Sequence, residues 1–304
     1  MTGTAQTAKA VAVVCGSNSL VGGMVTTRLR DAGWDVFTID PPHAAPHPAA
    51  RVRIKGEIWE AAAWAALLKS LPDSGQPPGI FVHAFGDSEN DAGAISNHAL
   101  RSAEQGARHL LPAMTAGGAV AFVASVLAGW DTRAGAAAFS AGQAGILALM
   151  RSLALSAAPS GIRVNAVCTG IVTTEPDVAP AAVRGRIPLG RTASPDDVAD
   201  AVLFLLSSDA SHVTGSTLIV DGGQSLQSWS NAPREGGYPL VIAPTSERKN
   251  GVSLSDSERA ESRQCETDGG RTTRFFVPQN DTATVQDTTT QRDTATPQRF
   301  QNQT

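Results

Sequence analysis

Val11-Ala12-Val13-Val14-Cys15-Gly16-Ser17-Asn18-Ser19-Leu20-Val21-Gly22-Gly23 is the stretch that decides the fold. Its first five residues form a continuous apolar run, which predicts a short strand buried on both faces. A glycine-rich turn follows, and a helix is expected from Met24 to Ala32, closed by Gly33. A strand, a glycine turn and a helix in this order are typical of a parallel sheet covered by helices.

The same alternation continues along the chain. Further strands are expected at Val36–Ile39, which ends on Asp40, and at Ile80–His83, Ala119–Ala124, Arg163–Cys168 and Ser216–Val220. Further helices are expected at Ala99–Met114, at Ala137–Ala157 and after the capping sequence Ser194-Pro195-Asp196-Asp197. We therefore predict one α/β domain over residues 8–227, with a doubly wound, Rossmann-like parallel sheet.

The character of the sequence changes after residue 227. Residues 228–246, which include Tyr238, are a candidate docking extension of the domain. Residues 247–304 are rich in Ser, Thr, Gln, Asp and Arg and poor in branched aliphatic residues, so we predict a disordered C-terminal tail. Residues 1–7 are expected to be a flexible N-terminus.

Composition excludes several classes of protein. The 304 residues are 42% hydrophobic and carry a formal net charge of −4, and no cluster reaches five Lys or Arg residues. We therefore expect no nucleic-acid partner and no polybasic membrane attachment. The three cysteines lack the spacing of a metal site, and neither a signal peptide nor an apolar run approaching a membrane span is expected. These features predict a cytoplasmic protein without a structural metal.

The glycine turn and Asp40 suggest a dinucleotide site. Glycines at the start of a helix let a pyrophosphate approach the backbone N–H groups, and the helix dipole favours its negative charge. An acid at the end of the second strand, here Asp40, can bind the ribose hydroxyls and disfavours the 2′-phosphate of NADP, so NAD is the expected cofactor. The alternative is that the glycines only shape a tight strand–helix turn.

Several motifs in order then indicate a family. The chain resembles the short-chain dehydrogenases/reductases over residues 8–227. The resemblance is carried by segments at 124–129, 140–145, 161–167, 188–191, 213–215 and 220–223, in the family's order along the chain.

The resemblance also implies where the family's catalytic Ser, Tyr and Lys would lie. These positions hold Ser125, Phe139 and Gln143 here. The family's Tyr exchanges a proton with the substrate oxygen, while the Lys lowers the phenol pKa and holds the nicotinamide ribose. Phenylalanine has no acidic hydrogen and glutamine carries no charge, so we expect Ser125 to be a vestige and the usual hydride-transfer route to be lost.

The same resemblance implies a set of residues around a nicotinamide cofactor. They are Gly16, Ser17, Ser19, Leu20, Val21, Gly22, Asp40, Ala84, Gly86, Val172 and Thr174. Leu20 stands where the family has a central glycine, and a branched side chain there would crowd the pyrophosphate. Leu20 therefore weighs against binding of NAD, while Asp40 and the retained glycines favour it.

Three functions remain open on this sequence. The first is a catalytically silent subunit that forms oligomers with an active homologue through its two long helices and last strand, as the resemblance implies. The second is an enzyme with altered chemistry, either non-redox or atypical NAD-dependent oxidoreduction on a small hydroxy or keto substrate. The third is an NAD-responsive regulator.

Overall fold

The structure, a computed structural model, describes residues 10–71, 76–86, 98–133 and 135–226. Residues 1–240 form one unit and residues 241–304 another, and all described residues belong to the first. The expected flexible N-terminus, docking extension and tail therefore lie outside the described residues, as does Tyr238.

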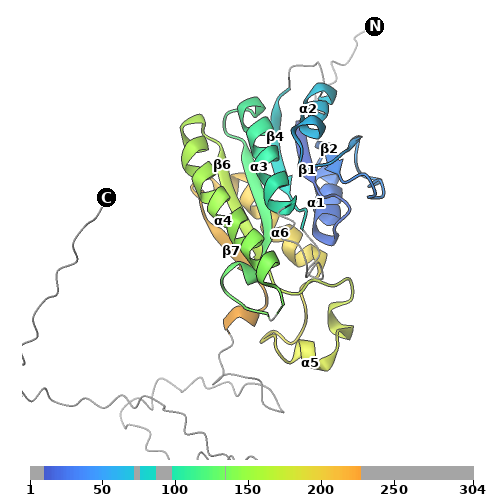
Figure 1. Cartoon of the computed structure of the whole chain (residues 1–304), viewed down its shortest axis with the longest axis vertical. Coiled ribbons are helices and arrows are strands. Elements are labelled where there is room, and N and C mark those ends of the chain that lie inside the picture. The colour runs from blue at the N-terminus through green and yellow to red at the C-terminus, as the bar shows by residue number, and fades with distance from the viewer. Residues whose placement is uncertain (1–9, 72–75, 87–97, 134, 227–304) are drawn as a thin grey trace, which may run out of the picture. The chain divides into compact units, whose positions relative to one another are not determined.

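Seven parallel strands form one sheet in the order β3-β2-β1-β4-β5-β6-β7 (Figure 1). Their bounds are Val11–Cys15 (β1), Asp35–Asp40 (β2), Val52–Lys55 (β3), Pro78–His83 (β4), Ala119–Ser125 (β5), Arg163–Thr169 (β6) and Thr217–Val220 (β7). The predicted doubly wound sheet is confirmed. The strand order reverses between β1 and β4, and ligands of such sheets bind at this reversal, beyond the carboxyl ends of the strands.

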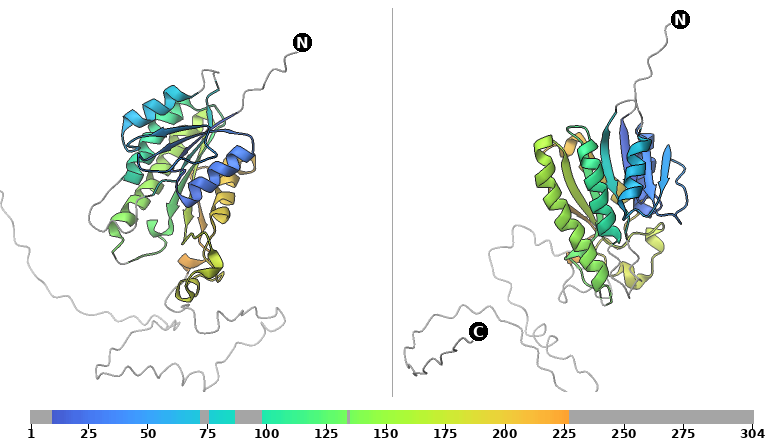
Figure 2. Two further views of the ribbon diagram at one scale, coloured as in Figure 1. Left: turned by 90° about the vertical axis from the view of Figure 1, so that its right-hand side faces the viewer. Right: turned by 45° about the horizontal axis from the view of Figure 1, so that its top comes forward.

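Helices cover both faces of the sheet. The left view of Figure 2 shows three layers, with α2, α3 and α4 on one side of the sheet and α1 and α6 on the other. The bounds of the helices are Leu20–Asp31 (α1), Ala61–Ser70 (α2), His98–Leu110 (α3), Ala137–Ala157 (α4), Ala181–Arg184 (α5) and Pro195–Leu206 (α6). Each helical layer encloses its own apolar core against the sheet.

Helix α1 starts earlier than expected, and two elements have no counterpart in the prediction. Helix α1 begins at Leu20 and not at Met24, because the side chain of Ser19 caps it by accepting a hydrogen bond from the Gly22 N–H. Strand β3 and helix α2 lie between the predicted strands Val36–Ile39 and Ile80–His83, and residues 41–51 cross from β2 to β3 as a loop.

Helix α4 also corrects an expectation about membranes. Residues Ala137–Ser160 form a helix that is long and apolar enough to cross a membrane, with a mean hydropathy of 1.3. The expectation that no apolar run approaches a membrane span is therefore wrong by length and composition. Buried core helices meet the same criterion, and α4 packs against α3, β5 and β6.

Candidate functional site

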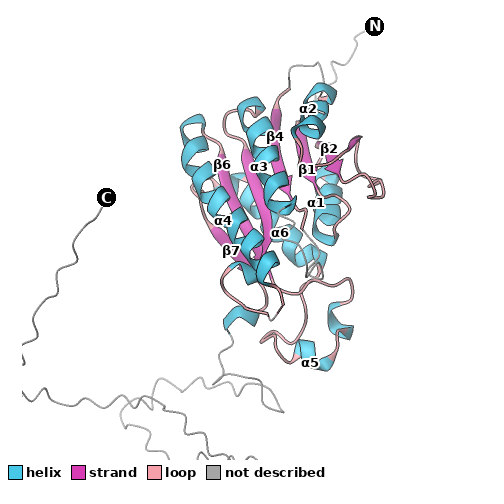
Figure 3. Cartoon of the chain, viewed as in Figure 1, coloured by secondary structure: helices cyan, strands magenta, loops and turns pink. Residues whose placement is uncertain are grey.

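The loops that follow the strands meet at one end of the sheet, the lower end in Figure 3. The glycine turn after β1 lies there against the loop after β4. Gly16 has a φ of +85°, and a Cβ on it would lie 2.6 Å from the backbone nitrogen of Phe85. A Cβ on Gly22 would lie 2.1 Å from the carbonyl oxygen of Gly16. The packing of the turn alone therefore requires both glycines.

Ser19 ties this turn together. Its Oγ lies 3.0 Å from the Gly22 nitrogen, whose hydrogen bond it accepts, and within reach of two backbone carbonyl oxygens, 2.9 Å from Gly16 and 3.0 Å from Ala84. The N-terminus of α1 thus lies beside the carboxyl ends of β1 and β4. This is the geometry in which a helix N-terminus can receive a phosphate.

Leu20 is the first residue of α1, and 48% of it is exposed. A leucine exposed at the helix N-terminus is free to extend over the backbone that a pyrophosphate would approach. The expectation that Leu20 narrows the cofactor path stays a prediction.

Asp40 lies at the end of β2, next to the turn, but it is fully buried. Its Oδ2 accepts a hydrogen bond of 2.7 Å from the Ser17 hydroxyl and lies 3.8 Å from Nε of Arg53, on the neighbouring strand β3. The other carboxylate oxygen, Oδ1, is buried without a partner. Two of the predicted cofactor residues, Ser17 and Asp40, are therefore brought together, and Arg53, which no sequence motif singles out, lies beside them.

These observations test whether the residues fit a nicotinamide dinucleotide. The glycine turn fits a pyrophosphate, because the helix N-terminus and the close backbone packing are both present. The unpartnered Oδ1 of Asp40 fits a ribose hydroxyl donor. Beyond these, Ala84 is buried after β4, Gly86 is exposed, Val172 is half-buried and Thr174 is exposed.

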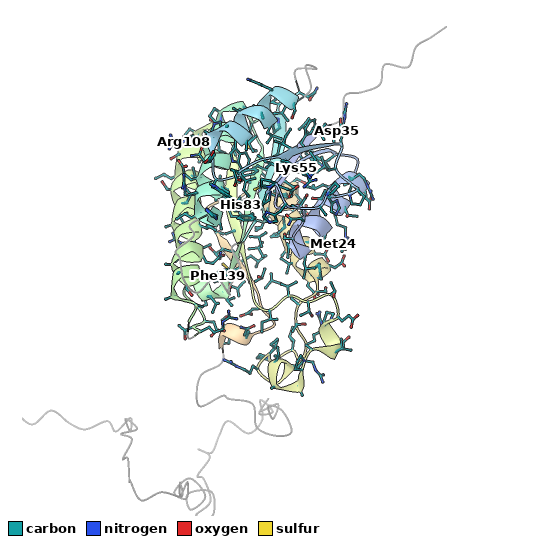
Figure 4. All side chains as sticks on the ribbon, turned by 45° about the vertical axis from the view of Figure 1, so that its right-hand side comes forward. Met24, Asp35, Lys55, His83, Arg108 and Phe139 are labelled. Atoms are coloured by element: carbon teal, nitrogen blue, oxygen red, sulfur yellow. The ribbon has the colours of Figure 1, made fainter. Side chains whose placement is uncertain are left out.

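The three positions implied for the family's catalytic Ser, Tyr and Lys hold side chains with structural contacts. Gln143 is 4% exposed, and its Oε1 accepts a hydrogen bond of 3.0 Å from the backbone N–H of Ser125. Oγ of Ser125 in turn accepts a hydrogen bond of 3.2 Å from the N–H of Leu127. Phe139 is half-buried one helical turn before Gln143, and in Figure 4 it lies at the lower end of α4. Gln143 therefore stabilises the end of β5 from the side of the strand that α4 covers.

A cavity of about 500 Å³ opens in front of Ser125. Its described lining residues are Ser125, Val126, Leu127, Asp131, Thr132, Arg133, Thr169, Gly170, Ile171, Val172, Arg186 and Gln224. Neither Phe139 nor Gln143 is among them, so only the serine of the predicted catalytic set faces this space. The loop after β5 contributes Asp131, Thr132 and Arg133 to this lining, and the segment after α5 contributes Arg186.

Asp131 and Gln224 close one side of the cavity. Nε2 of Gln224 donates a hydrogen bond of 2.8 Å to Oδ2 of Asp131, and its Oε1 accepts one of 3.3 Å from the N–H of Ile171. Sequence reasoning missed Gln224, because it lies 93 residues from Asp131 and no local pattern links the two.

His83 lies outside the cavity. It is fully buried at the end of β4, with Nε2 2.7 Å from the Ser102 hydroxyl on α3. Burial disfavours the charged imidazolium and lowers the pKa of His83 to about 3. His83 therefore fills a strand end as a neutral side chain.

Known proteins resemble this chain along most of its described length. Residues 77–225 match the family profile described as enoyl-(acyl carrier protein) reductase. The (3R)-3-hydroxyacyl-CoA dehydrogenase of Canis lupus familiaris is 28% identical over 248 residues, covering 70% of this chain and 95% of that protein.

Other matches are higher in identity and shorter. The cis-4-hydroxycyclohexanecarboxylate dehydrogenase of Sinomonas cyclohexanicum is 46% identical over 38% of this chain. This match spans 49% of the Sinomonas protein, and a match to a short-chain dehydrogenase/reductase of Sinorhizobium fredii spans 23% of that relative.

Solved structures agree in fold. A short chain oxidoreductase from Pseudomonas aeruginosa PAO1, solved with NADPH bound and described as containing an atypical catalytic center, superposes with a TM-score of 0.61 at 28% identity. The superposition covers 72% of this chain and 98% of that one.

Proposed function

This chain belongs to the short-chain dehydrogenase/reductase family, and we propose that it is a catalytically silent member that assembles with an active relative. The observation that carries the proposal is the buried hydrogen bond between Oε1 of Gln143 and the N–H of Ser125. The side chain at the position implied for the family's lysine holds the protein backbone, and it offers no positive charge to a phenol or a ribose.

The chemistry of the neighbouring side chains supports silence. A positioned proton donor contributes roughly 10²–10⁴-fold to such reactions, and Phe139 has no proton to give. His83 has a pKa of about 3 and is bonded to Ser102, away from the cavity. Burial raises the pKa of the Cys168 thiol to about 12, so this cysteine is a poor nucleophile.

A nicotinamide dinucleotide would supply the hydride in an active family member. In this chain the turn from Gly16 to Gly22 would hold its pyrophosphate and Asp40 its adenosine ribose, while Val172 and Thr174 would meet the nicotinamide. We propose NAD over NADP because of Asp40, with weak binding because that carboxylate is buried and Leu20 stands at the turn.

The proposed partner contact uses α3, α4 and β7. Leu155 on α4 is 80% exposed and Leu218 on β7 is 37% exposed. Apolar side chains at the surface of these elements support an interface that a second subunit would cover.

Purification from the native host tests the proposal. We expect a stoichiometric complex with an active family member, in which Ser125→Ala of this chain leaves the turnover of the complex unchanged. A homo-oligomer of this chain that oxidises an alcohol by itself would contradict silence.

A second candidate is an oxidoreductase with altered chemistry. It is favoured by the cavity at Ser125 and by the Pseudomonas relative, whose description names both an atypical catalytic center and NADPH. This candidate predicts saturable NADH or NADPH binding by the purified chain and a loss of turnover in Ser125→Ala. The same variant therefore separates the two functions.

A further inference from the structure

Two arginines distinguish the cavity in front of Ser125. Arg133 comes from the loop after β5 and Arg186 from the segment after α5, and both line the cavity while remaining largely exposed. Val126, Leu127 and Thr169 are buried in its wall. The cavity therefore has an apolar interior and a rim that carries two guanidinium groups.

Asp131 is the one acid in the described lining of the cavity. Asp131 accepts a hydrogen bond of 2.7 Å from the Thr132 N–H on Oδ1 and one of 2.8 Å from Gln224 on Oδ2. Both of its oxygens are thus engaged by neutral donors. The described lining therefore offers two guanidinium groups beside a carboxylate that is already bonded to neutral groups.

Each arginine also makes an interaction within the protein. A guanidinium has five N–H donors and can bind more than one acceptor group at a time. Planar carboxylates match the fork of an arginine and form charge-assisted hydrogen bonds that are stronger than neutral ones. Ser125 also lines the cavity and adds a hydroxyl, whose oxygen accepts from the Leu127 N–H and whose proton can be donated.

We propose that this cavity binds a small organic carboxylate, with the anionic group at Arg133 and Arg186 and the apolar body against Val126 and Leu127. The volume of about 500 Å³ suits a small molecule. The site requires neither turnover nor a partner subunit, so its failure and the failure of the proposed function are separate results.

Calorimetry of the purified full-length chain tests the proposal with benzoate and its neutral counterpart benzamide. We expect saturable benzoate binding and at least tenfold weaker benzamide binding, since a hydrogen bond to a charged group contributes about 1.5–3 kcal/mol. Arg133→Gln and Arg186→Gln should each weaken benzoate about tenfold or more on the same grounds and leave benzamide unchanged.

Arg184→Gln is the matched control. Arg184 lies on α5 two positions from Arg186, donates to the Ala179 carbonyl at 2.9 Å and does not line the cavity. Arg186→Lys keeps the charge without the fork and should give an intermediate affinity. Equal binding of benzoate and benzamide, no saturable benzoate binding, or an equal loss in Arg184→Gln would overturn the proposal. Inorganic phosphate that competes as well as benzoate would overturn the carboxylate class.

Discussion

The carboxamide of Gln143 accepts the backbone N–H of Ser125 in a nearly solvent-free position. Methionine has a similar shape but cannot accept this bond, so Gln143→Met would leave a buried donor unsatisfied. We expect a loss of about 1–3 kcal/mol in the free energy of unfolding, measured by urea denaturation. Gln105→Met on α3 is the control, because Nε2 of Gln105 donates to the neighbouring carboxylate of Glu104 and its Oε1 accepts no hydrogen bond that the substitution would break. Equal stability of Gln143→Met and the unchanged protein would show that the hydrogen bond from Ser125 to Gln143 does not stabilise the fold.

His83 gives the protein a pH dependence of its own. Because burial lowers its pKa to about 3, the unfolded chain binds a proton between pH 3 and about pH 6.5 that the folded chain does not. The free energy of unfolding should therefore fall by up to about 1.4 kcal/mol per unit as the pH falls through this window.

The measurement is a series of urea midpoints from about pH 6.5 to 4.5, above the range in which most carboxylates titrate. His83→Asn removes the titrating group, so its stability should vary less across the series. Burial also lowers the pKa of His47, which stays in both proteins and cancels in the comparison. Identical slopes in the two proteins would contradict the assignment to His83.

Helix α4 places positions 139 and 143 on one face, one turn apart, as the sequence spacing predicts. Phe139→Tyr with Gln143→Lys restores the phenol and the cation, and we expect weak alcohol oxidation with NAD that neither single variant shows. The activity should stay low, because the lysine enters a position that is 4% exposed and displaces the acceptor of the Ser125 N–H. NADH binding without any turnover in the double variant would contradict the expectation.

The elements that sequence could predict are those with a local signal. The bounds of α4 match the predicted Ala137–Ala157, and α6 begins after Ser194 with both hydrogen bonds of a capping box. The third strand, β3, has only a weak local signal, because its residues alternate between aliphatic and charged side chains and stay partly exposed at the sheet edge. Its pairing with β2 is a tertiary contact that its own four residues do not encode.

In the candidate site, too, the residues with a local sequence signal could be predicted and those that depend on tertiary contacts could not. Asp40 and Ser125 could be placed because each ends a predicted strand. Arg53 could not, because its proximity to Asp40 depends on the register in which Thr38 pairs with Arg53 across two strands. The cavity's arginines likewise come from separate loops after β5 and after α5. No spacing of residues within one segment predicts that these two loops line the same cavity.

At the scale of the whole molecule, the proposed assembly depends on the surface of α4. Leu155 is 80% exposed near the end of the helix, while the opposite side of α4 packs on the sheet through Ile146 and Met150. A large apolar side chain left in solvent gains free energy when a second subunit covers it. The proposed interface therefore has a residue that can be changed without touching the core.

Leu155→Glu should leave the folded chain within about 0.5 kcal/mol of its original stability, because the side chain makes no buried contact to lose. Burying the new carboxylate at an apolar interface is costly, so the affinity for the partner subunit should fall at least about tenfold. Light scattering after size exclusion would then report free subunits at concentrations where the unchanged chain is assembled. Val178→Glu is the matched control, since Val178 is 69% exposed in the short 3-10 helix Pro176–Val178, which belongs to none of α3, α4 and β7. Assembly that survives Leu155→Glu, or that Val178→Glu disrupts equally, would place the interface elsewhere on the molecule.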